Sequence, residues 1–317
     1  MKAPTTADSP PRLPRQIQEL RHSSRLLVRA LGFMRSRMEG TDCTPAQCHV
    51  LTELSARGPM TTGELATALE VDKSTASRSV GGLLNTGLIE SVPDPEDRRT
   101  RPVRLSTAGL ARVAELHAVA DAQVGGALEL LDPAERATVL RGISLYERAL
   151  HRAKALAEVA VRGVEPGDDG ALARIIRSVM TEFGAVGCGF SIEDREVDEM
   201  HATYTVARAA YFVAERDGRV IAGGGIAPLM GSESGDICEL RKMYALTEAR
   251  GLGVGRRILE RCLAAAREAG FRRCYLETLR HMDRARALYE KFGFERLTGP
   301  MGDTGHHRCD DWFLLEL

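Results

Sequence analysis

The sequence lacks the features that would place it among membrane or secreted proteins. No stretch of its 317 residues approaches the roughly 20 consecutive apolar residues that a membrane-spanning helix needs. The N-terminal segment MKAPTTADSPPRLPR has no apolar core of the kind found in secretory signals. Its prolines and small polar residues predict a disordered lead-in over 1–11. We therefore expect a cytoplasmic protein with no membrane partner.

Paired cysteines and an excess of one charge are also missing. The seven cysteines form no CxxC pair, which favours reduced thiols over a disulfide framework. His306, His307 and Cys309 stand together without a second ligand pair nearby, so we predict no bound metal. The net charge is −1 and both halves of the chain are close to neutral, so any nucleic-acid contact must depend on local positive charge.

The length predicts about two domains, and the pattern of the first is helical. Apolar residues at helical spacing predict helices over 12–38, 45–56, from Thr61 to Leu69, from Asp72 to Gly87, over 107–130 and over 133–157. Thr44 and Asp72 stand where helix N-caps are expected, and Thr61 with Glu64 has the spacing of a capping box. One charged hairpin, PDPEDRRTRP, interrupts the helices.

Beyond about residue 158 the pattern changes to mixed α/β. Strands are predicted over 158–164, on either side of the Asp217-Gly218 turn, and over 237–246, 274–279 and 312–317. Helices are predicted from Asp168 or Asp169 to Ile176, after Gly255 to Gly270, and over 283–292. We therefore predict a lead-in over 1–11, a first domain over 12–158 and a second over 159–317.

The helix after Asp72 has two different faces. Ala76, Val80, Leu83 and Leu84 share the apolar one, and Ser74, Ser77, Arg78 and Gly81 share the other. Small residues allow a helix to enter the major groove, hydroxyls bond phosphates or base edges, and arginine reads guanine. The candidate DNA contacts here are Ser74, Thr75, Ser77 and Arg78. An ordinary amphipathic surface helix has the same pattern, so the helix alone leaves both interpretations open.

The hairpin that follows favours DNA. Its arginines at 98, 99, 101 and 104 lie within seven residues, and acids at 94, 96 and 97 stand beside them. An arginine on a projecting β-wing suits a narrow minor groove. The alternative is a solvated charged turn, but helix, turn, helix and wing occur complete and in order.

This half resembles the MarR family of winged-helix repressors, over about residues 12–155. The motifs that carry the resemblance are STASRSVGGLLNTGLIE and DPEDRRTRPVRLSTAG. The resemblance implies a mainly α winged helix-turn-helix fold, double-stranded operator DNA as partner, and a homodimer held by the first and last helices. It implies that the wing arginine is Arg98 or Arg99, and that a small aromatic effector is possible.

In the second half, ARGLGVGRRIL (249–259) raises the question of which phosphate its glycines approach. A Walker A loop needs a lysine after its last glycine, and none follows Gly255. A Rossmann fingerprint has a different spacing and follows a first strand, whereas this run follows a fourth. A glycine turn that opens a helix directs backbone N–H groups and the helix dipole at one spot, and Arg256 and Arg257 add charge. The site suits a pyrophosphate.

The second half resembles the GNAT superfamily of acyl-CoA N-acyltransferases over about residues 159–317. Arg250, Gly253 and Gly255 meet its [RQ]-x-x-G-x-[GA] signature, and ARALYEKFGF (285–294) meets its second. The resemblance implies an α/β GNAT fold and acetyl-CoA as acyl donor. The cofactor-binding residues so implied are Met243, Tyr244, Ala245, Arg250, Gly251, Leu252, Gly253, Val254, Gly255 and Arg256. Many members have Asn where this chain has Met282, which puts one cofactor contact in doubt.

The implied reaction is direct transfer of an acetyl group to an amine in a ternary complex. Tyr289 is the candidate acid for the leaving thiolate, because a phenol pKa roughly matches that of a thiol. Its alternative role is packing on the next strand. Glu239 is the candidate base, acting through water, with a surface carboxylate as the alternative and Glu277 as rival. The N–H groups of Met243 to Ala245 are expected to supply the oxyanion contact.

The acceptor amine is left open. By resemblance it enters between 183–204 and 299–312, and acids in the first segment would favour a cationic amine unless they form a solvated face. Polyamine, amino acid, aminated antibiotic and protein lysine all fit. We predict a DNA-binding regulator fused to an acetyltransferase. The alternatives are a regulator whose second domain is a non-catalytic sensor of acetyl-CoA or an amine, and an enzyme that uses its winged helix only to dimerise.

Overall fold

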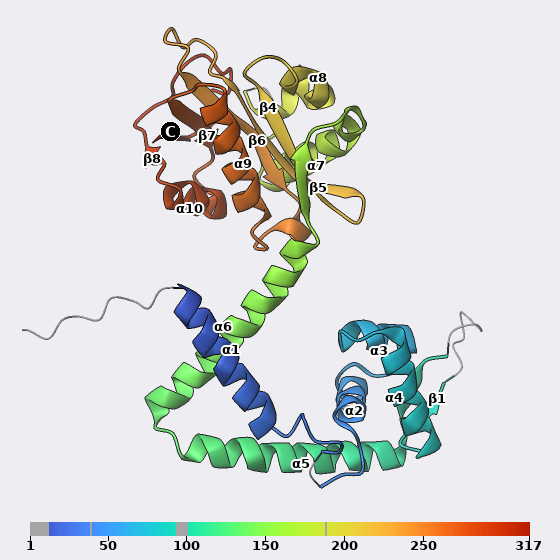
Figure 1. The fold of residues 1–317 in the computed structure, drawn as a ribbon. Coiled ribbons are helices and arrows are strands. Elements are labelled where there is room, and N and C mark those ends of the chain that lie inside the picture. Colours follow the sequence, from blue (N-terminus) through green and yellow to red (C-terminus); the bar gives the residue numbers. More distant parts are fainter. Residues whose placement is uncertain (1–12, 39, 93–100, 188) are drawn as a thin grey trace, which may run out of the picture. The chain divides into compact units, whose positions relative to one another are not determined.

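The computed structural model describes residues 13–38, 40–92, 101–187 and 189–317 and divides into two compact units, residues 1–138 and 139–317 (Figure 1). The division falls inside helix α6, Pro133–Ala157. The functional boundary near 158 stays a prediction. No helix among the described residues is long and apolar enough to cross a bilayer.

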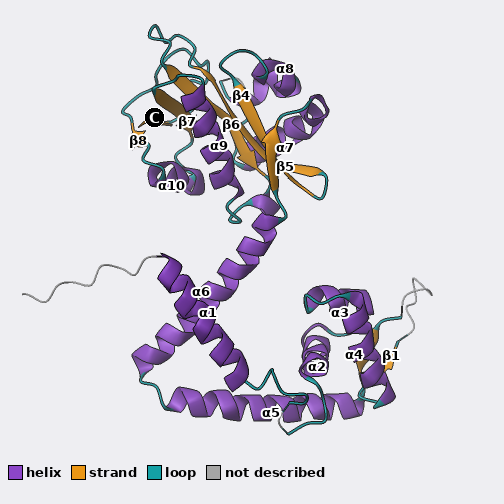
Figure 2. Ribbon diagram, in the orientation of Figure 1, coloured by secondary structure: helices purple, strands orange, loops and turns teal. Residues whose placement is uncertain are grey.

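The first unit consists of helices and one short hairpin (Figure 2). Its elements are α1 (Leu13–Ala30), α2 (Pro45–Arg57), α3 (Thr62–Ala68), α4 (Lys73–Asn85), β1 (Ile89–Ser91), β2 (Val103–Leu105), α5 (Thr107–Glu129) and the start of α6. The core forms where α2, α3 and α4 meet the N-terminal part of α5, with Leu51, Leu65, Leu83 and Val113 buried.

Local capping explains where these helices begin. Thr44 and Thr61 each accept the N–H of the third helical residue, and the side chains of Gln47 and Glu64 return the bond, so both capping boxes are complete. Asp72 accepts the Thr75 N–H at 2.9 Å, as predicted.

Two expectations for this unit were wrong. The first helix ends at Ala30 rather than at 38, because Gly32 takes a left-handed φ of +82° that a helix cannot continue through. Leu84 is exposed rather than part of the apolar face of α4, whereas Ser79 is buried and donates to the Thr75 carbonyl at 3.1 Å.

A seven-stranded sheet organises the second unit, in the order β3-β4-β5-β6-β7-β9-β8. The strands are β3 (Ala160–Gly163), β4 (Ala210–Arg216), β5 (Arg219–Pro228), β6 (Ile237–Ala245), β7 (Arg273–Thr278), β8 (Glu295–Arg296) and β9 (Asp311–Glu316). The helices are α7 (Asp169–Glu182), α8 (Met200–Tyr204), α9 (Val254–Glu268) and α10 (Asp283–Lys291). Only β6 and β7 pair in parallel; the other neighbours are antiparallel.

Both faces of the sheet are covered. Phe212 and Ala214 of β4 pack in the cluster that contains the apolar side of α9, whereas Tyr211 and Val213 pack with α7 and α8. The alternation follows from the period of two along a strand.

Helix α7 departs from its prediction in two ways. It runs on to Glu182 rather than ending at Ile176, because Val179 and Met180 continue its buried face. Asp168 precedes the helix without capping it; its carboxylate instead accepts from Arg162 Nη1 at 2.7 Å and from the Glu165 N–H.

Candidate functional site

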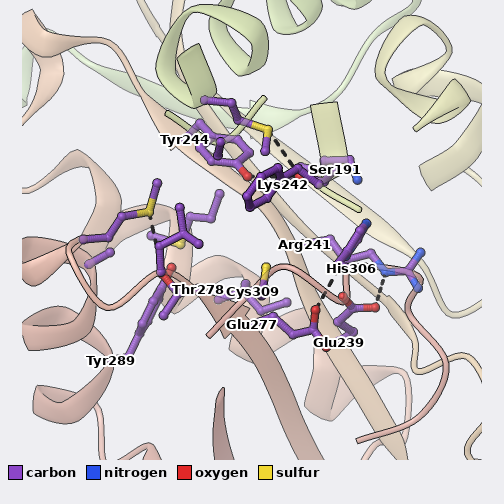
Figure 3. Close-up of a pocket in the computed structure, with 18 residues that line it drawn as sticks. Ser191, Glu239, Arg241, Lys242, Tyr244, Glu277, Thr278, Tyr289, His306 and Cys309 are labelled. Atoms are coloured by element: carbon purple, nitrogen blue, oxygen red, sulfur yellow. Dashed lines mark hydrogen bonds and ion pairs between the residues drawn. The ribbon is translucent and has the colours of Figure 1, made fainter. Parts of the chain in front are cut away.

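Strands β6 and β7 separate where a cavity opens between them. Their parallel pairing ends at Glu239–Tyr275, although β6 continues to Ala245 and β7 to Thr278. Beyond that point the edge of β6 that faces β7 pairs with no strand of the described residues, and a cavity of about 80 Å³ lies there. Its walls include Glu239, Met243, Tyr244, Glu277, Tyr289 and His306 (Figure 3). The candidate acid and the candidate base therefore line one cavity.

A bulge in β6 shapes the wall of this cavity. Lys242 has a left-handed φ of +49°, and the register between β5 and β6 shifts at this point. The Tyr211 hydroxyl donates to the Lys242 carbonyl at 2.8 Å and so holds the bulge. The Tyr211 ring needs the glycines of β5, because a Cβ at Gly223 or Gly225 would come within 2.6 Å of it.

Tyr289 of α10 is placed for both roles that the sequence left open, packing in the core and contact with the cavity. Its ring packs against Phe294 and Phe313, with centroids 5.8 and 6.3 Å away, and it also lines the cavity. The side chain is 6% exposed, and burial raises its pKa well above the usual phenol value. The hydroxyl therefore keeps its proton at neutral pH.

Glu239 is buried, so its reading as a surface carboxylate was wrong. It is 3% exposed, and Arg241 Nε donates to its Oε2 at 2.6 Å. Burial raises the pKa of Glu239, and Arg241 opposes that rise. Glu277 lines the same cavity, and its Oε1 accepts from the Tyr275 hydroxyl at 2.8 Å and from Thr304 at 3.0 Å.

The glycine run lies beyond the cavity, between β6 and α9. Gly251 and Gly253 have φ of +76° and +100°, and Gly253 stands at the N-cap of α9. A Cβ built on Gly251 meets nothing within 4 Å. Because the first N–H groups of a helix have no intrahelical partner, this loop presents donors at its open side.

The residues predicted to bind the cofactor fall into two groups. Met243 and Tyr244 line the cavity. The others lie outside its walls, at the end of β6, in the glycine loop and in the first turn of α9: Ala245, Arg250, Gly251, Leu252, Gly253, Val254, Gly255 and Arg256.

The arginines around the loop are largely engaged. Arg250 donates to the Ala245 carbonyl at 2.8 Å and makes a bidentate pair with Glu182 at 2.6 Å, so it braces the loop against α7. Arg256 pairs with Glu260 at 2.8 Å. Arg257 was expected to add charge to the anion site. Instead its Nη1 donates to two carbonyls at the end of α6 and the start of β3.

The acids of 193–199 divide into two groups: Asp194 and Glu196 are partly buried and face the cavity side, whereas Glu193, Asp198 and Glu199 are exposed, as a solvated face would be. Asp194 binds Lys242 and His306, Glu196 binds Lys242 at 2.7 Å, Asp198 binds Arg177 at 2.7 Å and Glu199 binds Arg195 at 3.3 Å. Reasoning from the sequence missed the roles of Arg241, Lys242 and His306. The available signal for Arg241 and Lys242 was their charge within the strand pattern ICELRKMYAL (237–246); His306 had none beyond its place in the late loop.

The predicted DNA contacts on α4 are exposed, except for Thr75, which is half-buried. The hydroxyls of Ser74 and Thr75 donate to Asp72, and Arg78 Nη2 donates to Thr75 Oγ1 at 3.1 Å. Ser77 faces solvent. These bonds preorganise the start of the helix.

The wing is described only at its base. Strands β1 and β2 pair from Ile89–Leu105 to Ser91–Val103, and Arg104 binds Glu90 at 2.7 Å. The predicted wing residues Arg98 and Arg99 lie outside the described residues.

Comparison with known proteins finds relatives of both units. Residues 174–294 match the model of the acetyltransferase (GNAT) family, and residues 41–100 match that of the MarR family. An uncharacterized N-acetyltransferase of Escherichia coli K12, YjgM, is 46% identical over 151 residues, which is 47% of this chain and 90% of that protein.

Solved structures similar to each unit are also found. The Salmonella typhimurium acetyltransferase yncA, with its cofactor acetyl-CoA, aligns over 50% of this chain and 94% of its own, at 18% identity and a TM-score of 0.42. Bordetella bronchiseptica BpsR, described as a DNA-binding protein regulated by 6-hydroxynicotinic acid, aligns over 42% of this chain and 98% of its own, at 25% identity and a TM-score of 0.36.

Proposed function

Because the chain belongs to the GNAT family of acetyltransferases and carries a MarR-family segment before it, we propose that it is a DNA-binding transcriptional regulator and an acetyl-CoA-dependent N-acetyltransferase. The observation that carries the enzymatic part is the parting of β6 from β7, with Tyr289 and Glu239 in the walls of the resulting cavity.

The unpaired edge of β6 and the glycine loop suit the donor. The N–H groups of Met243 to Ala245 would bind the pantetheine arm and the thioester oxygen, as a strand edge binds an extended chain; the end of the β6–β7 pairing at Glu239 supports this. The donors of Gly251 to Arg256 suit the pyrophosphate, because Gly251 and Gly253 keep side chains away from it. The Arg250–Glu182 pair supports the loop rather than the phosphates.

The chain's own groups then handle the protons. The amine nitrogen attacks the acetyl carbonyl, the C–S bond breaks, and the leaving thiolate takes the proton of Tyr289. Burial raises the pKa of that hydroxyl above the value that would match a thiol in water, so the transfer depends on a thiolate that forms in the same buried cavity, where its own charge is also destabilised. The cavity offers two carboxylates for the amine, Glu239, which Arg241 already holds, and Glu277.

In the first unit, α4 is proposed to enter the major groove of operator DNA. Ser74, Thr75 and Ser77 would bond phosphates or base edges, and Arg78 would read a guanine. Arg98 or Arg99 would contact the minor groove from the wing.

A second copy of the chain is proposed to complete the DNA-binding form. Helix α1 buries none of its residues, and Leu20, Leu27, Leu140 and Ile143 are among the large apolar side chains exposed on α1 and α6. Exposed apolar side chains of this kind, on each helix taken by itself, are typical of an interface. Light scattering at micromolar concentration is expected to give a dimer.

A sensor without turnover is the second candidate. It is favoured by Arg257, which follows the glycine loop on α9 and bonds the Leu156 carbonyl at 3.0 Å and the Val159 carbonyl at 2.8 Å. Binding at the loop would thus reach the end of helix α6, which begins in the first unit.

The test is acetyl-CoA consumption over a panel of spermidine, L-lysine, an aminoglycoside and a lysine peptide, beside a DNA shift assay with a selected palindromic site. Amine-dependent release of free thiol supports the enzyme; acetyl-CoA binding without it supports the sensor.

In the shift assay, Arg78→Ala is expected to cost about 1–3 kcal/mol at one base position and to relax specificity there. Unchanged affinity and specificity would remove the DNA interpretation of α4.

A further inference from the structure

One carboxylate oxygen in the cavity is buried without a partner. Glu277 of β7 is 4% exposed in its side chain, and the Tyr275 and Thr304 hydroxyls occupy its Oε1. Its Oε2 has no hydrogen-bond partner among the described residues. A buried acceptor left unsatisfied costs free energy, and more so when it carries charge. The atom is therefore suited to an N–H that a ligand brings.

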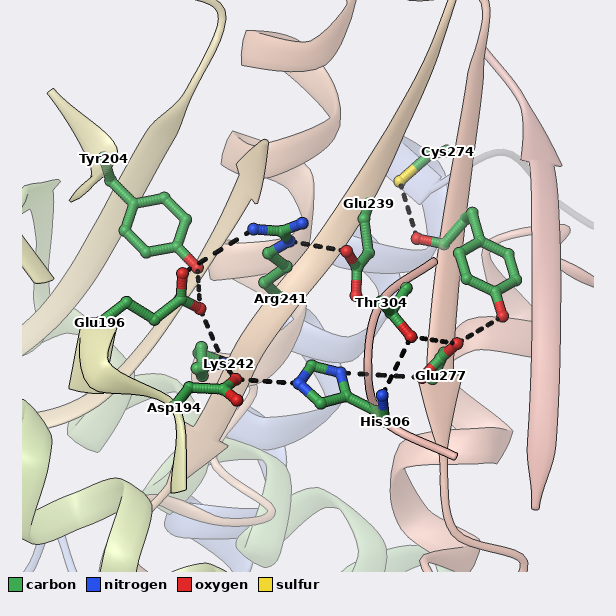
Figure 4. Close-up of polar contacts among 11 residues, drawn as sticks. Asp194, Glu196, Tyr204, Glu239, Arg241, Lys242, Cys274, Glu277, Thr304 and His306 are labelled. Carbon is green, nitrogen blue, oxygen red and sulfur yellow. Dashed lines mark hydrogen bonds and ion pairs between the residues drawn. The ribbon is translucent and has the colours of Figure 1, made fainter. Parts of the chain in front are cut away.

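His306 faces this oxygen from the late loop (Figure 4). Its Nε2 lies 2.8 Å from Asp194 Oδ2, and this contact with a carboxylate assigns the ring proton to Nε2. In the neutral ring Nδ1 then carries a lone pair, and it lies 3.7 Å from Glu277 Oε2. That distance is too long for a direct hydrogen bond. Two acceptors thus face each other across a gap.

An ammonium group satisfies both acceptors at once. A nitrogen at ordinary hydrogen-bond distance from each can span two atoms that are 3.7 Å apart. The chain's own nearby cations are engaged elsewhere: Lys242 is held by Asp194 and Glu196, and Arg241 by Glu239.

We propose that Glu277 Oε2 and His306 Nδ1 bind the acceptor's primary ammonium group and that His306 takes its proton. The proposal rests on the proposed acetyltransferase function and names its acceptor as a primary amine that enters protonated. It assigns the base to His306 rather than Glu239, whose carboxylate is held by Arg241 Nε at 2.6 Å.

Each proton that moves in the proposed reaction has a donor and an acceptor. One ammonium proton passes to His306 Nδ1, and the freed lone pair forms the N–C bond as the C–S bond breaks. The thiolate takes the Tyr289 proton, and the second N–H proton that leaves the nitrogen restores Tyr289. The imidazolium then donates from Nε2 to Asp194 and from Nδ1 towards Glu277, and it releases its extra proton to solvent before the next turnover. Glu239 adds negative charge nearby, and Lys242 neutralises part of that of Asp194.

The experiment compares Glu277→Gln and His306→Gln with His307→Gln, an exposed neighbour, in the full chain. With the best primary amine of the panel, Glu277→Gln is expected to raise KM for the amine by about tenfold or more. His306→Gln is expected to lower kcat by about 10²–10⁴-fold at neutral pH. The rate of His306→Gln is expected to recover as pH rises, because more amine is then already neutral. Acetyl-CoA affinity is expected to stay unchanged in all three.

A purely structural role of His306 would not produce recovery at high pH. The proposal is overturned if His306→Gln keeps the wild-type pH profile, or if Glu277→Gln binds the amine as well as wild type does.

Direct binding separates this inference from the proposed function. Calorimetry of the CoA-bound chain uses spermidine, L-lysine and L-lysine trimethylated at its side-chain nitrogen, which keeps the charge but has no N–H there. If wild type acetylates no amine, the enzymatic proposal fails. The ammonium site still stands if L-lysine binds more tightly than its trimethylated form and Glu277→Gln abolishes the difference. Binding of neither primary amine, or equal binding of L-lysine and its trimethylated form, overturns the site.

Discussion

At the scale of residues, the cavity depends on buried polar groups that fix one another. Tyr211 holds the Lys242 carbonyl, Lys242 holds Asp194, and Asp194 holds His306. Each bond satisfies a group that would be costly to bury alone. The bulge is thereby connected to the late loop, which explains how a loop side chain such as His306 can be positioned with the accuracy that catalysis needs.

Tyr289→Phe tests the proposed acid. The ring stays packed between Phe294 and Phe313, so fold and acetyl-CoA affinity are expected to persist. Turnover is expected to fall by about 10²–10⁴-fold, as for a lost general acid. Steady-state kinetics and calorimetry on the same preparation measure both quantities. Full activity in the variant would remove Tyr289 from this role.

At the scale of elements, most of the fold could be predicted because its signals are local. The caps at Thr44, Thr61 and Asp72 and the Asp217-Gly218 turn lie within a few residues of what they organise, and the structure confirms them. The parting of β6 from β7 is different, because neither strand's own pattern reveals where their pairing stops.

The candidate site was predictable only in part, for the same reason. The second family motif contains Tyr289, and Glu239 was the candidate base of the implied reaction, on the strand before the glycine loop; both line the cavity. The partners of the acids in 193–199 could not be read from the sequence, because Lys242 lies 48 positions from Asp194 and His306 lies 112 positions from it. Such contacts are set by the fold rather than by nearby residues.

The glycine loop supplies the next prediction. Gly253→Val places a β-branched residue at φ +100°, where it is strained, and its Cβ would lie 3.4 Å from the Leu156 side chain, so the loop is expected to lose the shape proposed to bind the pyrophosphate. Acetyl-CoA binding is expected to be lost in calorimetry. Gly142→Val in α6, where a Cβ meets nothing within 4 Å, is the matched control. Wild-type affinity in Gly253→Val would contradict the assignment of the loop.

The N-cap of α4 predicts that thermal stability depends on pH. Hydrogen bonds from Ser74 and Thr75 hold the pKa of Asp72 well below its usual range. A depressed folded pKa contributes stability above the unfolded value of about 3.9, and the contribution is lost as pH falls through the folded value. Below about pH 4, the melting temperature of wild type is expected to fall towards that of Asp72→Asn, which caps without titrating. Circular dichroism at several pH values measures the difference in melting temperature between wild type and Asp72→Asn. A difference that does not change with pH would contradict the role of the ionised cap.

At the scale of the whole molecule, the question is whether the two units act on each other. Helix α6 begins in the first unit and ends in the second, and its last turn is bonded by Arg257, two residues after the last glycine of the loop. A sensor needs such a link, whereas an enzyme joined to a DNA-binding unit does not. The proposed binding residues of the two units are separate, so variants of one leave the other's contacts intact.

The last prediction uses this separation. Coupling between two binding sites is reciprocal. If acetyl-CoA lowers the affinity for DNA tenfold, DNA must lower the affinity for acetyl-CoA tenfold. Calorimetric titration of acetyl-CoA with and without a selected palindromic site measures that factor. A sensor is expected to give unequal affinities, and Arg257→Ala is expected to reduce the difference, while Arg267→Ala, at an exposed position near the other end of α9, leaves it unchanged. Equal affinities in wild type would eliminate the sensor and leave a fusion whose two activities operate independently.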